Sequence, residues 1–235
     1  MKGWIITKKL KIAIVTTQEA SDVFPLISAL KELIRQKGEI AEVAIRSGED
    51  LKDPAQREQF ELLARGSHLV MFNLHGGKKS LPIFDELINA LKDSSASIYA
   101  QSSSNEPEID LMRLSTVDGE IYKKISLYLD YGGQENFYSL LLYLANCFAG
   151  GSYEFAKPKR PVWEGIYHPD FDHIPTLDEY LKGKYVAGRP TVGLWFYQSL
   201  WRSGNTAFID KMIAEIEGQG ANVIPVFLHA LKDVE

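Results

Sequence analysis

Three short stretches of the chain carry residue types that could bind a ligand or an ion. The first, 75–80 (HGGKKS), follows an apolar run and resembles a phosphate loop. A Walker A loop needs a glycine five places before its Gly-Lys and a Ser or Thr directly after the lysine, and both are missing. Two interpretations remain: a glycine turn with His75 as a hydrogen-bonded turn residue, or a ligand contact through His75. No G-x-G-x-x-G dinucleotide fingerprint occurs in the sequence.

The second stretch, 167–173 (YHPDFDH), places two imidazoles and two carboxylates in one short loop. Such groups can bind zinc, cobalt or nickel. Carboxylates beside proline and aromatic residues are also common in turns, where they accept hydrogen bonds from nearby amides. His168 and Asp170 are therefore candidates for substrate or metal contact, with a structural turn or a contact to a neighbouring domain as the alternatives.

The third stretch is 201–206 (WRSGNT), between a predicted strand and a predicted helix. Ser, Asn and Thr can cap a helix, and free amides at a helix start can hold an anion. Trp201, Arg202 and Asn205 could thus bind a planar aromatic ligand that carries a carboxylate. The alternative is a capped helix whose tryptophans fill a domain interface.

Parallel strands alternating with helices must position these loops, because strand-like runs and segments of helical period alternate along the chain. We predict an α/β fold, with a Rossmann-like or flavodoxin-like parallel sheet flanked by helices. The predicted strands are 11–17, 41–46, 68–74, 97–101, 191–197 and 222–228. The predicted helices are 21–36 (capped by Ser21 or Asp22), 54–65, 81–92, 118–130, 135–148, 176–183 and one between the last two strands.

The predicted domains are an N-terminal α/β domain at 1–150, a proline-rich connector at 151–189 and the start of a second α/β domain at 190–235. The second domain amounts to one strand–helix–strand unit, whose apolar helix stripe needs more sheet than two strands provide. We expect this unit to pack on the preceding part of the chain or on another molecule, or to be the front of a larger protein.

Composition excludes several classes of protein. With 31 acidic and 26 basic residues, no general field attracts the chain to nucleic acid or to an anionic membrane. No apolar run has the length of a membrane span or a signal peptide, so we expect a cytoplasmic protein. Cys147 is the only cysteine and lies in an apolar run, which predicts a buried, inert thiol.

Seven motifs occur in order along the chain: LHGG at 74–77, STV at 115–117, YGGQEN at 131–136, GIYHPDF at 165–171, RPTVGLWFY at 189–197, WRSGNT at 201–206 and VIPVFLHALKD at 223–233. Together they resemble the N-terminal region of the cobaltochelatase large subunit. The sequence is similar, more distantly, to the porphyrin-binding H subunit of magnesium chelatase. The LHGG and GGxEN elements favour the cobalt-type branch.

The resemblance implies a part in ATP-dependent insertion of cobalt into a tetrapyrrole, a corrin ring precursor, in cobalamin biosynthesis. It implies AAA+ ATPase subunits as partners, with ATP and cobalt used by the complete complex and no cofactor bound by this chain. The second unit could also form a homo-oligomer. We assign no catalytic residue; His168, Asp170, Trp201, Arg202 and Asn205 are the candidates for tetrapyrrole contact. The alternatives are a magnesium chelatase H-type porphyrin-binding subunit and a structural docking head with no ligand of its own.

Overall fold

The computed structural model describes residues 8–17, 19–103 and 108–229 of the 235-residue chain. The chain divides into two compact units, Met1–Lys159 (unit 1) and Arg160–Glu235 (unit 2). The division falls inside the predicted connector, so that 151–159 belongs to unit 1 and 160–189 to unit 2. No helix in the described ranges is long and apolar enough to cross a membrane.

Unit 1 is built on a parallel sheet of four strands, in the order β2-β1-β3-β4. This is the flavodoxin-like order. In the Rossmann order, 3-2-1-4, the third strand of the chain would lie at the edge of the sheet instead of beside the first strand. The predicted α/β class is therefore confirmed, and the open choice between the two topologies is decided. The strands are β1 (Leu10–Thr16), β2 (Ala41–Ser47), β3 (Leu69–Leu74) and β4 (Ser97–Ser102).

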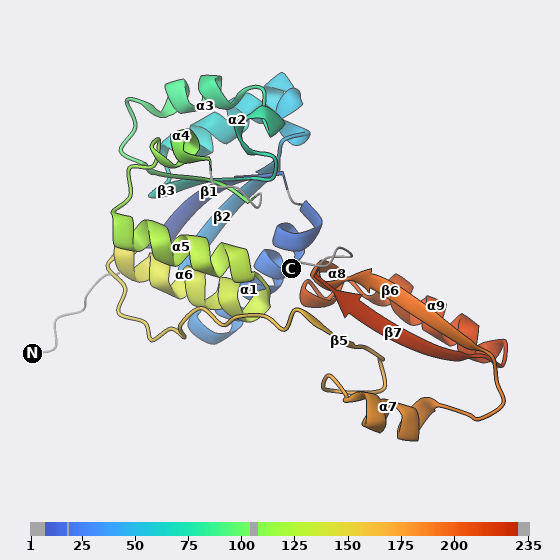
Figure 1. Ribbon diagram of the computed structural model, residues 1–235. Helices are drawn as coiled ribbons and strands as arrows, with labels where there is room; N and C mark the ends of the chain where they lie inside the picture. Colours follow the sequence, from blue (N-terminus) through green and yellow to red (C-terminus); the bar gives the residue numbers. More distant parts are fainter. Residues whose placement is uncertain (1–7, 18, 104–107, 230–235) are drawn as a thin grey trace, which may run out of the picture. The chain divides into compact units, whose positions relative to one another are not determined.

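Helices cover both faces of this sheet (Figure 1). One face packs against α1 (Glu19–Lys37), α5 (Gly119–Tyr131) and α6 (Gln134–Ala149). The other face packs against α2 (Pro54–Arg65), α3 (Phe84–Leu91) and α4 (Ile109–Met112). Two short 3-10 turns, η1 (Asp50–Lys52) and η2 (Gly77–Ser80), follow β2 and β3. Because both faces are covered, β3 is buried along its whole length and reads as a continuous apolar run.

Helix α6 lies between the sheet and the first part of the predicted connector. Asn146 and Asn136 on its outer side each exchange two hydrogen bonds with that segment, at Tyr153 and at Lys159, over 2.7–2.9 Å. These amide pairs satisfy the backbone of an extended strip that has no sheet partner of its own. The predicted end of α6 is confirmed, since Gly150 adopts the left-handed conformation that terminates helices.

Two local predictions for unit 1 were wrong. The predicted buried thiol, Cys147, is exposed and is not among the buried residues of α6. Neither Ser21 nor Asp22 caps α1, since the helix already begins at Glu19. Asp22 instead lies inside the helix and is buried.

Unit 2 contains a three-stranded sheet in the order β5-β7-β6. Strands β6 (Thr191–Tyr197) and β7 (Asn222–Leu228) are parallel, as predicted, and β5 (Glu164–Ile166) is antiparallel to β7. The third strand comes from the predicted connector, which was expected to hold only one short helix. That helix is α7 (Leu177–Lys184); α8 (Gln198–Arg202) and α9 (Ala207–Gly218) link β6 to β7.

Helix α9 covers one face of this sheet (Figure 1). Its Ile209 and Ile213 are buried against Phe196, Val223 and Phe227. Gly165 on β5 has no room for a side chain, because an added Cβ would lie 2.8 Å from the Phe227 ring. The helix stripe predicted from the sequence thus finds part of its partner surface within unit 2.

Candidate functional site

The carboxyl end of β6 leads into the first group of candidate residues. The strand passes directly into α8, and a tight turn at Ser203–Asn205 connects α8 to α9. The Asn205 amide donates to the Leu200 carbonyl over 2.9 Å, and Gly204 adopts a left-handed conformation. Asn205 is exposed and Arg202 is half-buried, so their side chains reach the surface from one short segment.

Trp201 has a packing role in the same segment. Its ring stacks on Phe227, with 4.5 Å between centroids and 4° between planes. One face of the indole is therefore part of the unit 2 core, as the packing interpretation expected. The cap at the start of α9 differs from expectation, because the Thr206 side chain makes no capping bond to the helix. Thr206 lies within 3.0 Å of the hydroxyl of Tyr167, which also donates to Asp210 over 2.7 Å.

His168 belongs to a second, separate group. Its side chain is buried, and Nδ1 accepts a hydrogen bond from the Asp170 amide over 3.1 Å. The proton therefore lies on Nε2, which donates to Glu217 over 3.2 Å. Both ring nitrogens are hydrogen-bonded within the protein. This is the structural turn that the sequence offered as the alternative to a ligand contact.

Asp170 forms an ion pair with Lys184 of α7 at the surface. The hydrogen bond from Lys184 and its charge hold the pKa of this carboxyl below the usual value for aspartate. Asp172 and His173, the other two groups of the predicted cluster, bond to each other over 2.9 Å and are exposed. Within the described ranges, no three His, Cys, Asp or Glu side chains gather closely enough to hold a metal ion.

The two groups lie at opposite ends of α9. His168 contacts Glu217 in the last turn of that helix, whereas Arg202 and Asn205 precede its first turn. A helix of 12 residues is about 18 Å long at about 1.5 Å per residue. The five predicted contact residues therefore fall into two groups, one at each end of α9, and do not form one cluster within unit 2.

The glycine loop after β3 is a turn held by the chain's own groups. Gly76 and Gly77 both have left-handed φ values, which lets the chain leave the sheet sharply. The His75 amide donates to the Thr17 hydroxyl over 2.7 Å, and the Lys78 amide donates to the Glu108 carboxylate over 3.0 Å. The loop is therefore a glycine turn, whereas a ligand contact through His75 stays a prediction.

A row of polar residues crosses the carboxyl end of the unit 1 sheet, and the sequence reasoning missed it. Ser47, Thr16, Asn73 and Gln101 are in register on the four strands, and all four are buried. Asp22 of α1 accepts hydrogen bonds from Thr16 over 3.0 Å and from Asn73 over 2.7 Å. The signal was available, because each of the four strands has a polar residue at its last or second-last position.

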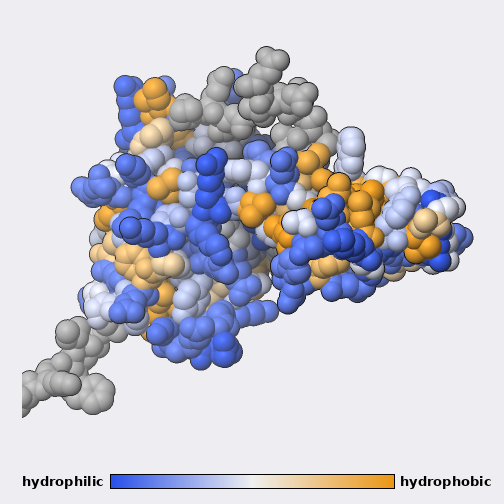
Figure 2. Space-filling model, turned by 60° about the horizontal axis from the view of Figure 1, so that its bottom comes forward, coloured by the Kyte–Doolittle hydropathy of each residue, from blue (hydrophilic) through white to orange (hydrophobic). Residues whose placement is uncertain are grey.

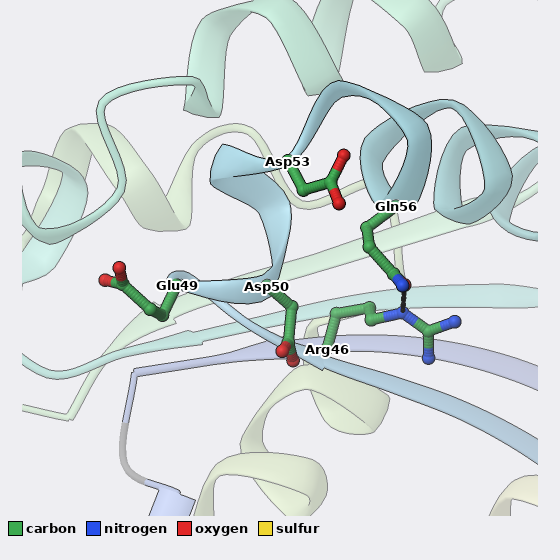
Figure 3. A pocket seen from close by; sticks show the side chains of 5 residues that line it. All are labelled: Arg46, Glu49, Asp50, Asp53 and Gln56. Atoms are coloured by element: carbon green, nitrogen blue, oxygen red, sulfur yellow. Dashed lines mark hydrogen bonds between the residues drawn. The ribbon is translucent and has the colours of Figure 1, made fainter.

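An open cleft lies beside this end of β2 (Figure 3), also missed from the sequence. Its volume is about 420 Å³, and it is lined by Arg46, Glu49, Asp50, Asp53 and Gln56. Figure 3 shows the three carboxylates pointing in different directions rather than toward one point. Asp50 accepts from the Ser47 amide over 2.8 Å and Asp53 caps α2, so these two acids stabilise local structure.

The fold and these strand-end loops define a class: a flavodoxin-like parallel domain followed by a second α/β unit. The same fold occurs in a solved structure, the catalytic subunit of cobaltochelatase from Mycobacterium tuberculosis. It aligns with 97% of this chain and 17% of its own length, at a TM-score of 0.63 and 17% sequence identity.

The particular family follows from the sequence comparisons. Residues 126–235 match the family model described as CobN/Magnesium Chelatase. This match, together with the relatives described below, confirms the resemblance drawn from the seven motifs. The last residues of the seventh motif, 230–233, lie outside the described residues.

Relatives with similar sequences are much longer than this chain. An uncharacterized protein of Methanocaldococcus jannaschii is 31% identical over 75% of the chain. The aerobic cobaltochelatase subunits CobN of Pseudomonas aeruginosa and of a Sinorhizobium species are 28% and 29% identical over 74% of it. The chain spans 14% of the length of each of these three relatives.

Proposed function

We propose that the chain acts as the N-terminal part of a cobaltochelatase large subunit in the ATP-dependent insertion of cobalt into a tetrapyrrole during cobalamin biosynthesis. The observation that carries this proposal is the similarity over 74% of the chain to two proteins named as aerobic cobaltochelatase subunits. The LHGG and GGxEN elements add support for cobalt over magnesium. ATP would be hydrolysed by separate AAA+ partner subunits.

Metal insertion sets chemical demands that apply to the whole complex. Two inner pyrrole protons must be removed, the ring must be distorted and the metal ion must lose water. We assign none of these steps to a residue of this chain. Its proposed contribution is to position the tetrapyrrole or to dock the other subunits, and turnover by the chain alone with cobalt, ATP and substrate would contradict that assignment.

Arg202 and Asn205 are the best-placed candidates for tetrapyrrole contact. Both belong to one surface segment, and a guanidinium can bind a peripheral carboxylate through two hydrogen bonds. Trp201 shares one ring face with the core and has less freedom to stack on a ligand. His168 and Asp170 remain candidates only for a separate contact, at the far end of α9.

The test is a titration of the isolated chain with hydrogenobyrinate-type and porphyrin ligands, followed by absorbance. We expect a ring-dependent spectral shift. The affinity read from it should fall about ten-fold in Arg202→Ala, because a charge-assisted hydrogen bond is lost. The matched control is Lys211→Ala, an exposed cation on α9. A shift with porphyrin alone would favour the magnesium-type alternative. No shift with either ligand would remove ring binding and leave the docking head.

A further inference from the structure

Strand β6 has a free edge without the usual protection. Among the described residues it pairs only with β7, and its seven residues (TVGLWFY) include no charged residue and no proline. Natural edge strands are commonly protected by charge, proline or a covering segment, because an unprotected edge can pair with another strand.

The edges of the unit 1 sheet show the contrast. The outer edge of β4 is covered, since Ser115 and Thr116 bond to the backbone of Ala100 and Ile98. The outer edge strand β2 contains charged Arg46, whose guanidinium bonds to the Ile45 carbonyl over 2.9 Å. Of the sheet edges in the described residues, β6 thus stands apart as a long apolar edge.

The sheet face turned away from α9 is also apolar. Trp195 and Tyr197 alternate with the buried Phe196, and their side chains are 68% and 55% exposed. They are in register with Val226 and Leu228 of β7. Figure 2 shows orange and blue surface side by side on unit 2, at the right of the view. Parallel strands are normally covered on both faces, and α9 covers only one here.

We propose that β6 and its Trp195–Tyr197 face are the docking surface for the remainder of a cobaltochelatase large subunit, whether joined to this chain or separate. That partner would add a strand beside β6 and an apolar layer over Trp195 and Tyr197. The length of the relatives favours this occupant, because about six-sevenths of each lies outside the region that the chain matches. The inference rests on the proposed function and names the partner of one surface.

The experiment uses the full chain and the Pseudomonas aeruginosa cobaltochelatase subunit from which the matched region has been deleted. Binding is measured by titration calorimetry, and hydrogen exchange reports on the β6 amides. We expect binding to protect β6 and to weaken about ten-fold or more in Trp195→Lys, since a buried aromatic anchor becomes a charge. Leu62→Lys, an equally exposed apolar position on α2, is the matched control and should bind as the wild type does.

Three results would overturn the proposal. If Trp195→Lys and Leu62→Lys bind the deleted subunit equally well, the interface lies elsewhere. Protection of β6 in the chain alone, lost on dilution, would make a second copy the occupant. If the separate subunit does not bind, the chain and the deleted subunit are expressed as one fused polypeptide, and hydrogen exchange is repeated. Free exchange of the β6 amides in this fusion would show that nothing docks on β6. None of these readouts needs metal insertion, so a fusion with protected β6 that fails to insert cobalt would contradict the proposed function and leave the interface standing.

Discussion

At the scale of single residues, the structure separates candidates that share similar chemistry in the sequence. Arg202 and Asn205 reach the surface, whereas Trp201 stacks on Phe227 and His168 is enclosed. Residue type alone could not make this distinction, because it depends on which neighbours the fold supplies. Glu217, the partner of His168, is 49 positions away in the sequence.

His168 should therefore act in stability. His168→Ala removes a buried ring and leaves the Asp170 amide and Glu217 without their partner, so we expect a loss of about 2–4 kcal/mol in the free energy of unfolding. Urea unfolding followed by tryptophan fluorescence suits this test, because Trp163, Trp195 and Trp201 all lie in unit 2.

The matched control for that measurement is His173→Ala, because the His173 side chain is 57% exposed. We expect it to change the unfolding free energy by less than about 0.5 kcal/mol. A His168→Ala variant as stable as the wild type, but with weaker tetrapyrrole binding, would return His168 to the ligand contacts.

At the scale of elements, local pattern predicted most of the fold. All six predicted strands and the main helices are present, because their apolar periods reflect which faces are buried. Strand β5 was missed, since three residues are too few to show a period. The polar row was missed for another reason: its meaning depends on strand register, which emerges only when β1, β2, β3 and β4 pair.

The polar row should stabilise unit 1 as a connected network. Asn73 bonds to Asp22 and to Gln101, so Asn73→Ala leaves both buried groups short of a partner. We expect a loss of about 2–4 kcal/mol in the unfolding free energy, measured by far-UV circular dichroism in urea. Asn89→Ala, at an exposed position on α3, is the control and should change it by less than about 0.5 kcal/mol.

The turn after β2 should make a contribution to the unfolding free energy of unit 1 that is lost in acid. Hydrogen bonds from the Ser47 amide and hydroxyl hold the pKa of Asp50 below the usual value for an aspartate. A depressed folded-state pKa adds stability above the unfolded-state value, and this contribution is lost as pH falls through the lower folded-state value. The wild type should thus exceed Asp50→Asn in stability at neutral pH, and the difference should shrink below about pH 4. The measurement is urea unfolding of both proteins at several pH values. A stability difference between the wild type and Asp50→Asn that does not change with pH would contradict this account.

At the scale of the whole molecule, the chain is a flavodoxin-like unit followed by a second α/β unit, and residues 126–235 are similar to the CobN/Magnesium Chelatase family. The sequence indicated this family through seven motifs, and strand order then fixed the topology. Neither source brings the five candidate residues into one site. The proposed role, in which the chain contributes one surface or one contact to a longer subunit, does not require them to form one.

The most direct test of that role is a replacement in the Pseudomonas aeruginosa cobaltochelatase subunit. Its matched region is exchanged for this chain, and ATP-dependent cobalt insertion is measured with the partner subunits, beside the subunit with that region deleted. We predict that the chimera inserts cobalt well above the deleted form. The contradicting result is a chimera no more active than the deleted form, although hydrogen exchange shows both units folded and β6 protected.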